Sequence, residues 1–254
     1  MCVTMTRKAT RGVAVLPLLG IATFAGCAKS PSVPGNAVGT QIVVSMTVRG
    51  MIRPDYFYYV LFNNSADGSG TSGPIPVVAP PYGNGFAAGT FTQFVLVNGA
   101  QGGGGGGSAA PVGYGVFAVA PGSNLRSFTP LPSPVQTATG TSTIQFRIPL
   151  SELATTAVPA ANIRYLQINF VNTNTVPVDP NYTGLKLFDA LGDSTQPGGV
   201  NDYISIDVTK AATYQNSDKG LEGPNDVVQV GNGTFQVVDE PDLDIVNWQV
   251  QVVD

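Results

Sequence analysis

The stretch that decides the fold runs from residue 141 to residue 171 and reads TSTIQFRIPLSELATTAVPAANIRYLQINFV. Apolar and polar side chains alternate from Thr143 to Leu150, and the alternation resumes from Leu166 to Phe170. A period of two residues is typical of a β-strand with one buried face. The stretch therefore predicts two strands joined by a short irregular segment.

The segment between these strands carries signals for a strand end and a turn. Pro149 has no N–H group to give to a sheet ladder, so the first strand should end there. Ser151 is expected to cap one short turn from Ser151 to Leu153, with Glu152 favourably placed at its N-terminal end. A loop that contains Pro159 should then lead into the second strand.

Segments of the same kind recur along the chain. Residues 56–62, YFYYVLF, are apolar on both faces and should form a central strand. Residues 114–119 are expected to pair with residues 91–97, and Trp248 is expected to face inward from the last strand. The other expected strands are residues 42–49, 203–208, 227–230, 235–238 and 245–252.

Length and composition favour one all-β domain. The chain has 254 residues, of which 43% are hydrophobic, and its 31 Gly and 20 Pro indicate many turns. Large all-β folds of this length are often single domains. No helix-period pattern of useful length follows the N-terminal segment. We therefore predict a two-sheet antiparallel β-sandwich, jelly-roll-like, over residues 41–254.

The first 26 residues have the features of a lipoprotein signal peptide. Arg7, Lys8 and Arg11 form a basic start, and residues 12–25 are an apolar run too short to span a bilayer. The run ends in TFAG followed by Cys27, which resembles the bacterial lipoprotein lipobox, with Phe where Leu is usual. The resemblance implies that Cys27 is acylated with fatty acids such as palmitate and becomes the first mature residue. Ordinary cleavage that leaves Cys27 free is the alternative.

The mature chain is expected to be tethered to a membrane of the bacterial cell envelope, on its periplasmic or outer-surface side. Residues 27–40 are rich in Ser, Pro, Ala and Gly and read as a flexible tether. Cys2 leaves with the signal, so no internal disulfide can form. Removing residues 1–26 leaves 12 − 3 = 9 basic and 16 acidic residues, a net charge of −7. Such a surface repels phosphate backbones, which argues against a nucleic-acid partner.

Three segments resemble bacterial sandwich modules of the DOMON and family-9 carbohydrate-binding type. These are IQFRIPLSEL, YFYYVLF and the closing LDIVNWQVQV. The resemblance implies the sandwich fold over about residues 41–254, and those families bind sugars or haem. Haem-binding members use His and Met as axial ligands, and this chain has no His; sugar-binding members use a pair of Trp, and this chain has one. The fold therefore carries over better than the ligand.

The residue inventory argues against an enzyme. Without His there is no Ser-His-Asp triad, no Cys-His pair and no imidazole metal ligand. The six glycines Gly102–Gly107 lack the Lys and Ser/Thr of a phosphate loop and read as a mobile tip. The three glutamates, Glu152, Glu222 and Glu240, lie in separate segments, so a glycosidase-type carboxylate pair is not favoured.

One loop region concentrates oxygen ligands. Residues 189–207 read DALGDSTQPGGVNDYISID, and Asp189, Asp193, Asn201 and Asp202 surround a Gly-rich turn. Calcium takes six to eight oxygens, many of them from loops. The alternative is that Asp, Asn and Gly make turns here. Calcium is thus a candidate ligand of this loop.

Aromatic residues in and beside loops are the candidates for ligand binding. Tyr82, Asn84, Phe86 and Tyr114 combine ring faces with a hydrogen-bonding side chain, as sugar recognition requires. The leading hypothesis is a non-enzymatic, membrane-anchored binding module with carbohydrate as a candidate ligand. The alternatives are a structural or assembly subunit that docks on other envelope proteins through an uncovered sheet edge, and a glycan-active enzyme.

Overall fold

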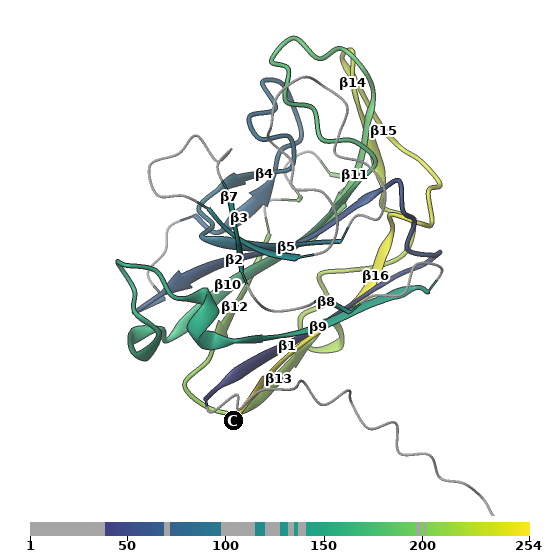
Figure 1. Ribbon diagram of the computed structural model, residues 1–254. Helices are drawn as coiled ribbons and strands as arrows, with labels where there is room; N and C mark the ends of the chain where they lie inside the picture. The colour runs from purple at the N-terminus through teal and green to yellow at the C-terminus, as the bar shows by residue number, and fades with distance from the viewer. Residues whose placement is uncertain are drawn as a thin grey trace, which may run out of the picture. The chain divides into compact units, whose positions relative to one another are not determined.

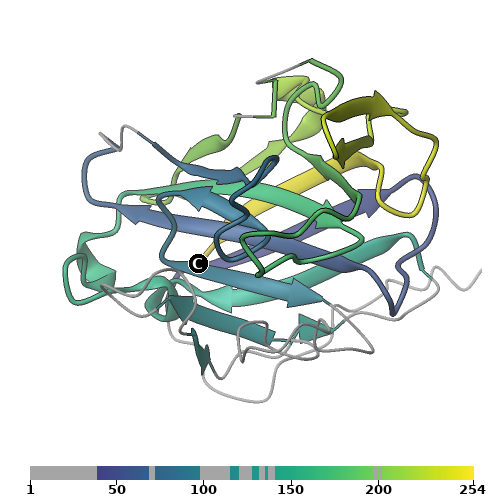
Figure 2. The ribbon, with the colours of Figure 1, turned by 90° about the horizontal axis from the view of Figure 1, so that it is seen from above.

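A computed structural model describes residues 39–68, 72–97, 115–119, 128–131, 135–136, 141–196, 199–200 and 202–254. Residues Ala37–Asp254 form one compact unit. Two antiparallel sheets lie in layers, as the side view in Figure 1 and the view from above in Figure 2 show. The predicted all-β sandwich is confirmed.

The smaller sheet has five strands. Their order is β13 (Ala212–Gln215), β16 (Ile245–Val253), β1 (Gln41–Val48), β9 (Thr143–Pro149) and β8 (Val135–Gln136). In β9, Ile144, Phe146 and Ile148 are buried while Gln145 and Arg147 are exposed, as the period of two predicts. This sheet therefore has one face on the core and one face in solvent.

The larger sheet has nine strands. Its order is β15 (Thr234–Val237), β14 (Val228–Gly231), β11 (Lys186–Ala190), β10 (Tyr165–Thr173), β2 (Phe57–Ser65), β5 (Gln93–Val97), β6 (Gly115–Val119) and β7 (Phe128–Leu131), with β12 (Ile204–Asp207) also paired to β10. Its central strands β2, β5 and β10 are buried on both faces. The expected pairing of β5 with β6 is confirmed.

Alternate residues of β2 pack into two separate hydrophobic clusters. Tyr58, Val60 and Phe62 join the core between the two sheets, which also contains Trp248. Phe57 and Leu61 point to the opposite face and join an outer cluster. This explains why YFYYVLF is apolar throughout: successive side chains point to opposite faces, and both faces are buried.

The outer cluster is covered by the segment that connects β2 to β5. This segment contains the short pair β3 (Pro74–Pro76) and β4 (Ala87–Gly89). Phe86 stacks on Tyr59 of β2 with ring centroids 4.1 Å apart. The described part of this segment, residues 72–92, therefore covers part of the outer face of the larger sheet and is called the lid.

One local prediction was wrong, and several short elements were not predicted. The turn after β9 is a 3-10 helix, η1 (Leu150–Leu153), and Ser151 does not cap it: the residue at its N-cap is Pro149, without a side-chain hydrogen bond. A second 3-10 turn, η2 (Ala160–Asn162), and one four-residue helix, α1 (Asn216–Lys219), were not expected. Strands β3, β4, β7, β8, β11 and β13 were not predicted either.

Candidate functional site

The β14–β15 hairpin forms one end of the larger sheet. Its two-residue turn, Asn232 and Gly233, has φ angles of 49° and 75°. Positive φ at both turn positions is the geometry that Asn-Gly adopts most readily, and it matches the twist of the two strands. The dipeptide lies between VQV and FQV, so the sequence specifies this hairpin locally.

Strand β15 has an open edge. It pairs with β14 alone among the strands that the structure describes. The Val238 N–H donates to the Val227 carbonyl. In an antiparallel pair, the main-chain N–H and C=O groups of successive residues point alternately toward the partner strand and away from it. The main-chain N–H and C=O groups of Phe235 and Val237 therefore point away from β14.

The side chains of β15 extend the outer hydrophobic cluster beyond its cover. Phe235 lies opposite Val230, and Val237 lies opposite Val228. Directly opposed residues point to the same face of a sheet, and both valines of β14 belong to the outer cluster. Yet Phe235 and Val237 are 43% and 49% exposed. The same apolar face of the sheet is thus buried at β14 and exposed to solvent at β15, the next strand.

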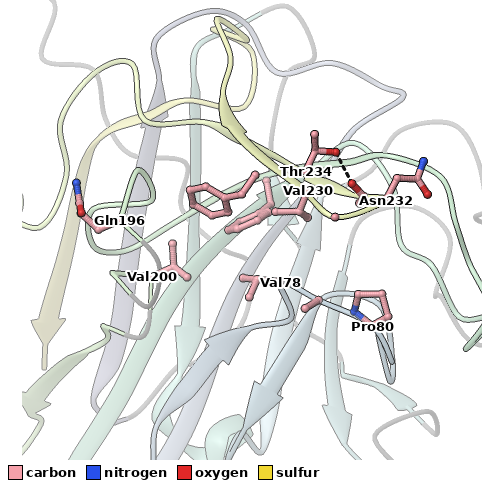
Figure 3. Close-up of a pocket in the computed structure, with 12 residues that line it drawn as sticks. Val78, Pro80, Gln196, Val200, Val230, Asn232 and Thr234 are labelled. Carbon is pink, nitrogen blue, oxygen red and sulfur yellow. Dashed lines mark hydrogen bonds between the residues drawn. The ribbon is translucent and has the colours of Figure 1, made fainter.

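An apolar pocket of about 330 Å³ opens beside this edge. The hairpin forms one wall, the lid segment forms a second, and Gln196 and Val200 form a third. Figure 3 shows Val78, Val200 and Val230 around the pocket, each from a different wall. Phe188 and Phe235 also line it. A pocket of this size with mostly apolar walls can take one large apolar group.

The predicted aromatic binding residues do not form an exposed surface. Tyr82 and Phe86 are each 1% exposed, because both belong to the lid and pack against the protein. The Asn84 side chain accepts hydrogen bonds from the N–H groups of Phe86 and Ala87 and holds the turn between them. The expectation of exposed rings at positions 82 and 86 was wrong. Tyr114 lies outside the described residues.

A fully buried lysine fixes the lid to the sheet. Lys186 of β11 donates hydrogen bonds to the carbonyls of Val77 and Gly85, at 2.7 and 2.8 Å. Its ammonium also lies 5.6 Å from the centre of the Tyr82 ring. Burial lowers the pKa of Lys186 to about 7, because desolvation disfavours the charged form. Lys186 thus holds the lid, which forms one wall of the pocket, against the larger sheet.

A buried cluster of carboxylates lies where the two sheets meet. The carboxylate of Asp189 reaches β16, where its Oδ2 accepts the Ile245 N–H at 2.6 Å. One carboxylate oxygen from each of Asp189, Asp226 and Asp244 lies within 4.8 Å of the other two. Burial, followed by the charge of Asp226, raises the pKa of Asp189. These oxygens come from three separate segments of the chain.

A polar cavity of about 520 Å³ adjoins this cluster. Asp226 and Glu222 line it, together with Asp193 and Asp202. Burial raises the pKa of Glu222, and the nearby charges of Asp189 and Asp226 raise it further. The cavity gives the cluster a polar connection to the surface loops.

The predicted calcium residues separate into different environments. Asp189 is buried in the cluster, while Asp193 and Asp202 line the adjoining cavity. Asp193 accepts hydrogen bonds from the main chain and hydroxyl of Thr195, as in a local turn. Asn201 lies outside the described residues.

Sequence reasoning missed the partners that the fold brings to Asp189. Asp226 and Asp244 are 37 and 55 residues further along the chain, and Glu222 was assigned only to a separate loop. For the hairpin, the Asn-Gly dipeptide was an available signal. No local signal marks the carboxylate cluster, because it depends on long-range pairing.

Comparison of the chain with protein-family models, with curated proteins and with solved structures gives no match. In the part of the chain that the structure describes, no helix is long and apolar enough to cross a membrane. Cys27 and the preceding segment lie outside the described residues.

Proposed function

We propose that this protein is a lipid-anchored lipoprotein of the bacterial envelope, and that its β-sandwich docks an extended segment of another envelope protein along β15. The observation that carries the docking is the open edge of β15, where outward main-chain groups adjoin exposed apolar side chains. The lipobox-like sequence before Cys27 supports the anchor. The protein acts by binding and not by catalysis.

An added strand would satisfy the main-chain groups at this edge. An extended peptide can pair with the outward N–H and C=O groups of Phe235 and Val237 and continue the sheet by one strand. Its alternate side chains would then cover the two exposed apolar residues of β15. One larger apolar side chain can enter the neighbouring pocket lined by Val78, Val200 and Val230. Main-chain pairing supplies affinity, and the pocket supplies selectivity.

Charge favours a basic partner over a second copy of this chain. Without residues 1–26 the chain has a net charge of 9 − 16 = −7, so two copies repel each other. Asp239 is the second residue after β15, with a side chain that is 80% exposed even though it is paired with Arg49. The proposed occupant is therefore an extended segment with alternating apolar residues and flanking Lys or Arg.

Two of the three rings on which the carbohydrate hypothesis was based, those of Tyr82 and Phe86, are buried in the lid and give it no support. A sugar ring stacks on an exposed aromatic face, and these two residues do not provide one.

A peptide selection tests the docking proposal. The purified full chain, held in detergent, is used to select from a displayed library of random extended peptides. Selected peptides should alternate apolar residues and carry basic ends. Replacing both Phe235 and Val237 by Ser should reduce their affinity by at least tenfold, since both removed side chains cover the docked strand.

Met51→Ser is the matched control. Met51 is 56% exposed and lies in the turn after β1, outside the hairpin and outside the lining of the pocket, so this variant also loses an exposed apolar side chain. It should bind the selected peptides as the unaltered chain does. Equal losses in both variants, or selected peptides that bind the double variant unchanged, would contradict docking at β15.

A further inference from the structure

We propose that Asp189, Asp226, Asp244 and Glu222 form a calcium site buried at the junction of the two sheets. The site is independent of the docking edge on β15. It uses one of the loop residues that the sequence suggested and three that only the fold brings together.

Each of the four carboxylates retains an oxygen with unused bonding capacity. Asp244 directs Oδ2 to the Arg49 guanidinium at 2.5 Å and to the Asn225 N–H, while its Oδ1 has no hydrogen-bond partner among the described residues. Asp226 Oδ1 and Glu222 Oε2 are likewise buried and unpaired within the described part of the chain. Among the described residues, Asp189 Oδ2 accepts only the Ile245 N–H and keeps a second lone pair. Buried oxygens without a donor are costly, so a bound cation or a shared proton is needed to satisfy them.

The spacing of these oxygens fits one coordination shell. Ca²⁺ binds oxygens at about 2.3–2.6 Å, so two ligands of one ion are at most about 5 Å apart. The oxygens of Asp189, Asp226 and Asp244 lie within 4.8 Å of one another. Six to eight ligands complete the shell of calcium, and the adjoining cavity of about 520 Å³ has room for water molecules that supply the others.

Charge also favours a cation. Three carboxylates gather here and Glu222 lines the adjoining cavity. The only cationic side chain that the structure pairs with any of the four, within the described residues, is Arg49. Burial and the charge of Asp244 raise the pKa of Asp226 to about 7. A divalent ion removes this repulsion and returns the carboxylates to their charged forms.

A shared proton is the competing explanation. The carboxylates of Asp226 and Asp244 lie within hydrogen-bond reach of each other, so one protonated acid could donate to the other. That arrangement satisfies the pair without any ion. The two explanations differ in what calcium does to the protein.

Calorimetry and thermal unfolding with CaCl₂ distinguish a calcium site from a shared proton. The full chain, freed of metal with a chelator, should bind one Ca²⁺ in titration calorimetry at pH 7.5. Its melting temperature should rise by about 5–10 °C when free Ca²⁺ is 100 times the dissociation constant. Mg²⁺ at equal concentration should raise it much less, since it demands a smaller octahedral shell.

Asp226→Asn is the test variant, because an amide can donate to Asp244 Oδ1 and needs no ion. It should remain folded by circular dichroism and lose both the calorimetric signal and the calcium-dependent shift. Glu222→Gln serves as the second variant if the first does not fold, and it should weaken calcium binding at least tenfold. Asp218→Asn, at an exposed position on α1, should change nothing.

Three results would overturn the calcium site. The first is no heat signal and no shift at 5 mM CaCl₂ in the unaltered chain, which assigns the shared proton. The second is binding that Asp226→Asn leaves intact, and the third is an equal response to Mg²⁺. A failure of peptide docking at β15 would leave this site unaffected, because the two share no residue.

Discussion

At the scale of single residues, two neighbouring tyrosines of β2 show how the two faces of one strand differ. The Tyr58 hydroxyl donates to the Asp242 carbonyl at 3.0 Å and accepts the Arg53 N–H at 2.9 Å. The Tyr59 hydroxyl is buried in the outer cluster and has no partner among the described residues. Burial raises the pKa of both phenols. Only one of the two hydroxyls therefore stabilises the fold.

The matched pair of Phe substitutions tests this difference. Tyr58→Phe should lower the free energy of unfolding by about 1–3 kcal/mol, because it leaves two partly buried main-chain groups without this partner. Tyr59→Phe should be neutral or stabilising by up to about 1 kcal/mol, because it removes an unpaired polar atom. Urea unfolding followed by the fluorescence of Trp248 measures both. A clear destabilisation by Tyr59→Phe would show that its hydroxyl has a partner.

Lys186 should make the stability of the protein depend on pH. Its pKa is about 7 in the folded chain, against 10.5 when exposed. Between these values the unfolded chain binds more protons, so the free energy of unfolding rises as pH increases from about 7 to about 10 and is flat for this group below pH 7. The full effect is at most about 5 kcal/mol. The titratable side chain that faces it, Tyr82, stays neutral in this range because burial raises its pKa.

Lys186→Met should remove that rise, even though it lowers stability at every pH by leaving the carbonyls of Val77 and Gly85 unpaired. Lys210→Met, at a side chain that is 70% exposed, is the control and should keep the rise. Denaturant unfolding at pH 6.5, 8 and 9.5 supplies the comparison. A slope that survives in Lys186→Met would assign it to another group.

At the scale of elements, the alternation of apolar and polar residues predicted the positions of most strands. It did not predict which distant groups pack against them. The period of two identified β9 and β1, because each has one buried and one exposed face. It missed β11, KLFDA, where a buried lysine and a buried aspartate replace the expected apolar residues. Their burial depends on carbonyls and carboxylates from distant segments, which no local pattern encodes. The same reason hid the carboxylate cluster and the exposure of β15.

Two glycine substitutions measure how much the β14–β15 turn depends on a residue that tolerates positive φ. Gly233 has φ of 75°, and a Cβ there would meet no atom within 4 Å; a Cβ at Gly223 would also meet none, and its φ is not in the left-handed range. Gly233→Ala should therefore cost about 1 kcal/mol from backbone strain alone. Gly223→Ala should be close to neutral. Equal melting temperatures for the two variants would show that the turn tolerates a side chain.

At the scale of the whole molecule, the proposed anchor determines where the docking edge works. Replacing Cys27 by Ser removes the thiol that acylation requires. The variant should appear in the soluble fraction instead of the membrane fraction, and the unaltered chain should begin with an acylated Cys27 in mass spectrometry. A free N-terminal cysteine, or cleavage elsewhere, would contradict the lipoprotein assignment and leave the sandwich unaffected.

The central claim is that β15 is an open edge that accepts another strand, and amide exchange at β15 tests it most directly. In the full chain without peptide, the amides of Phe235 and Val237 should exchange with solvent near their intrinsic rates, while that of Val238, bonded to Val227, should be protected. A saturating peptide from the selection should protect Phe235 and Val237 at least tenfold and leave Val238 unchanged. Unprotected amides at 235 and 237 with bound peptide, or protected ones without it, would contradict the account.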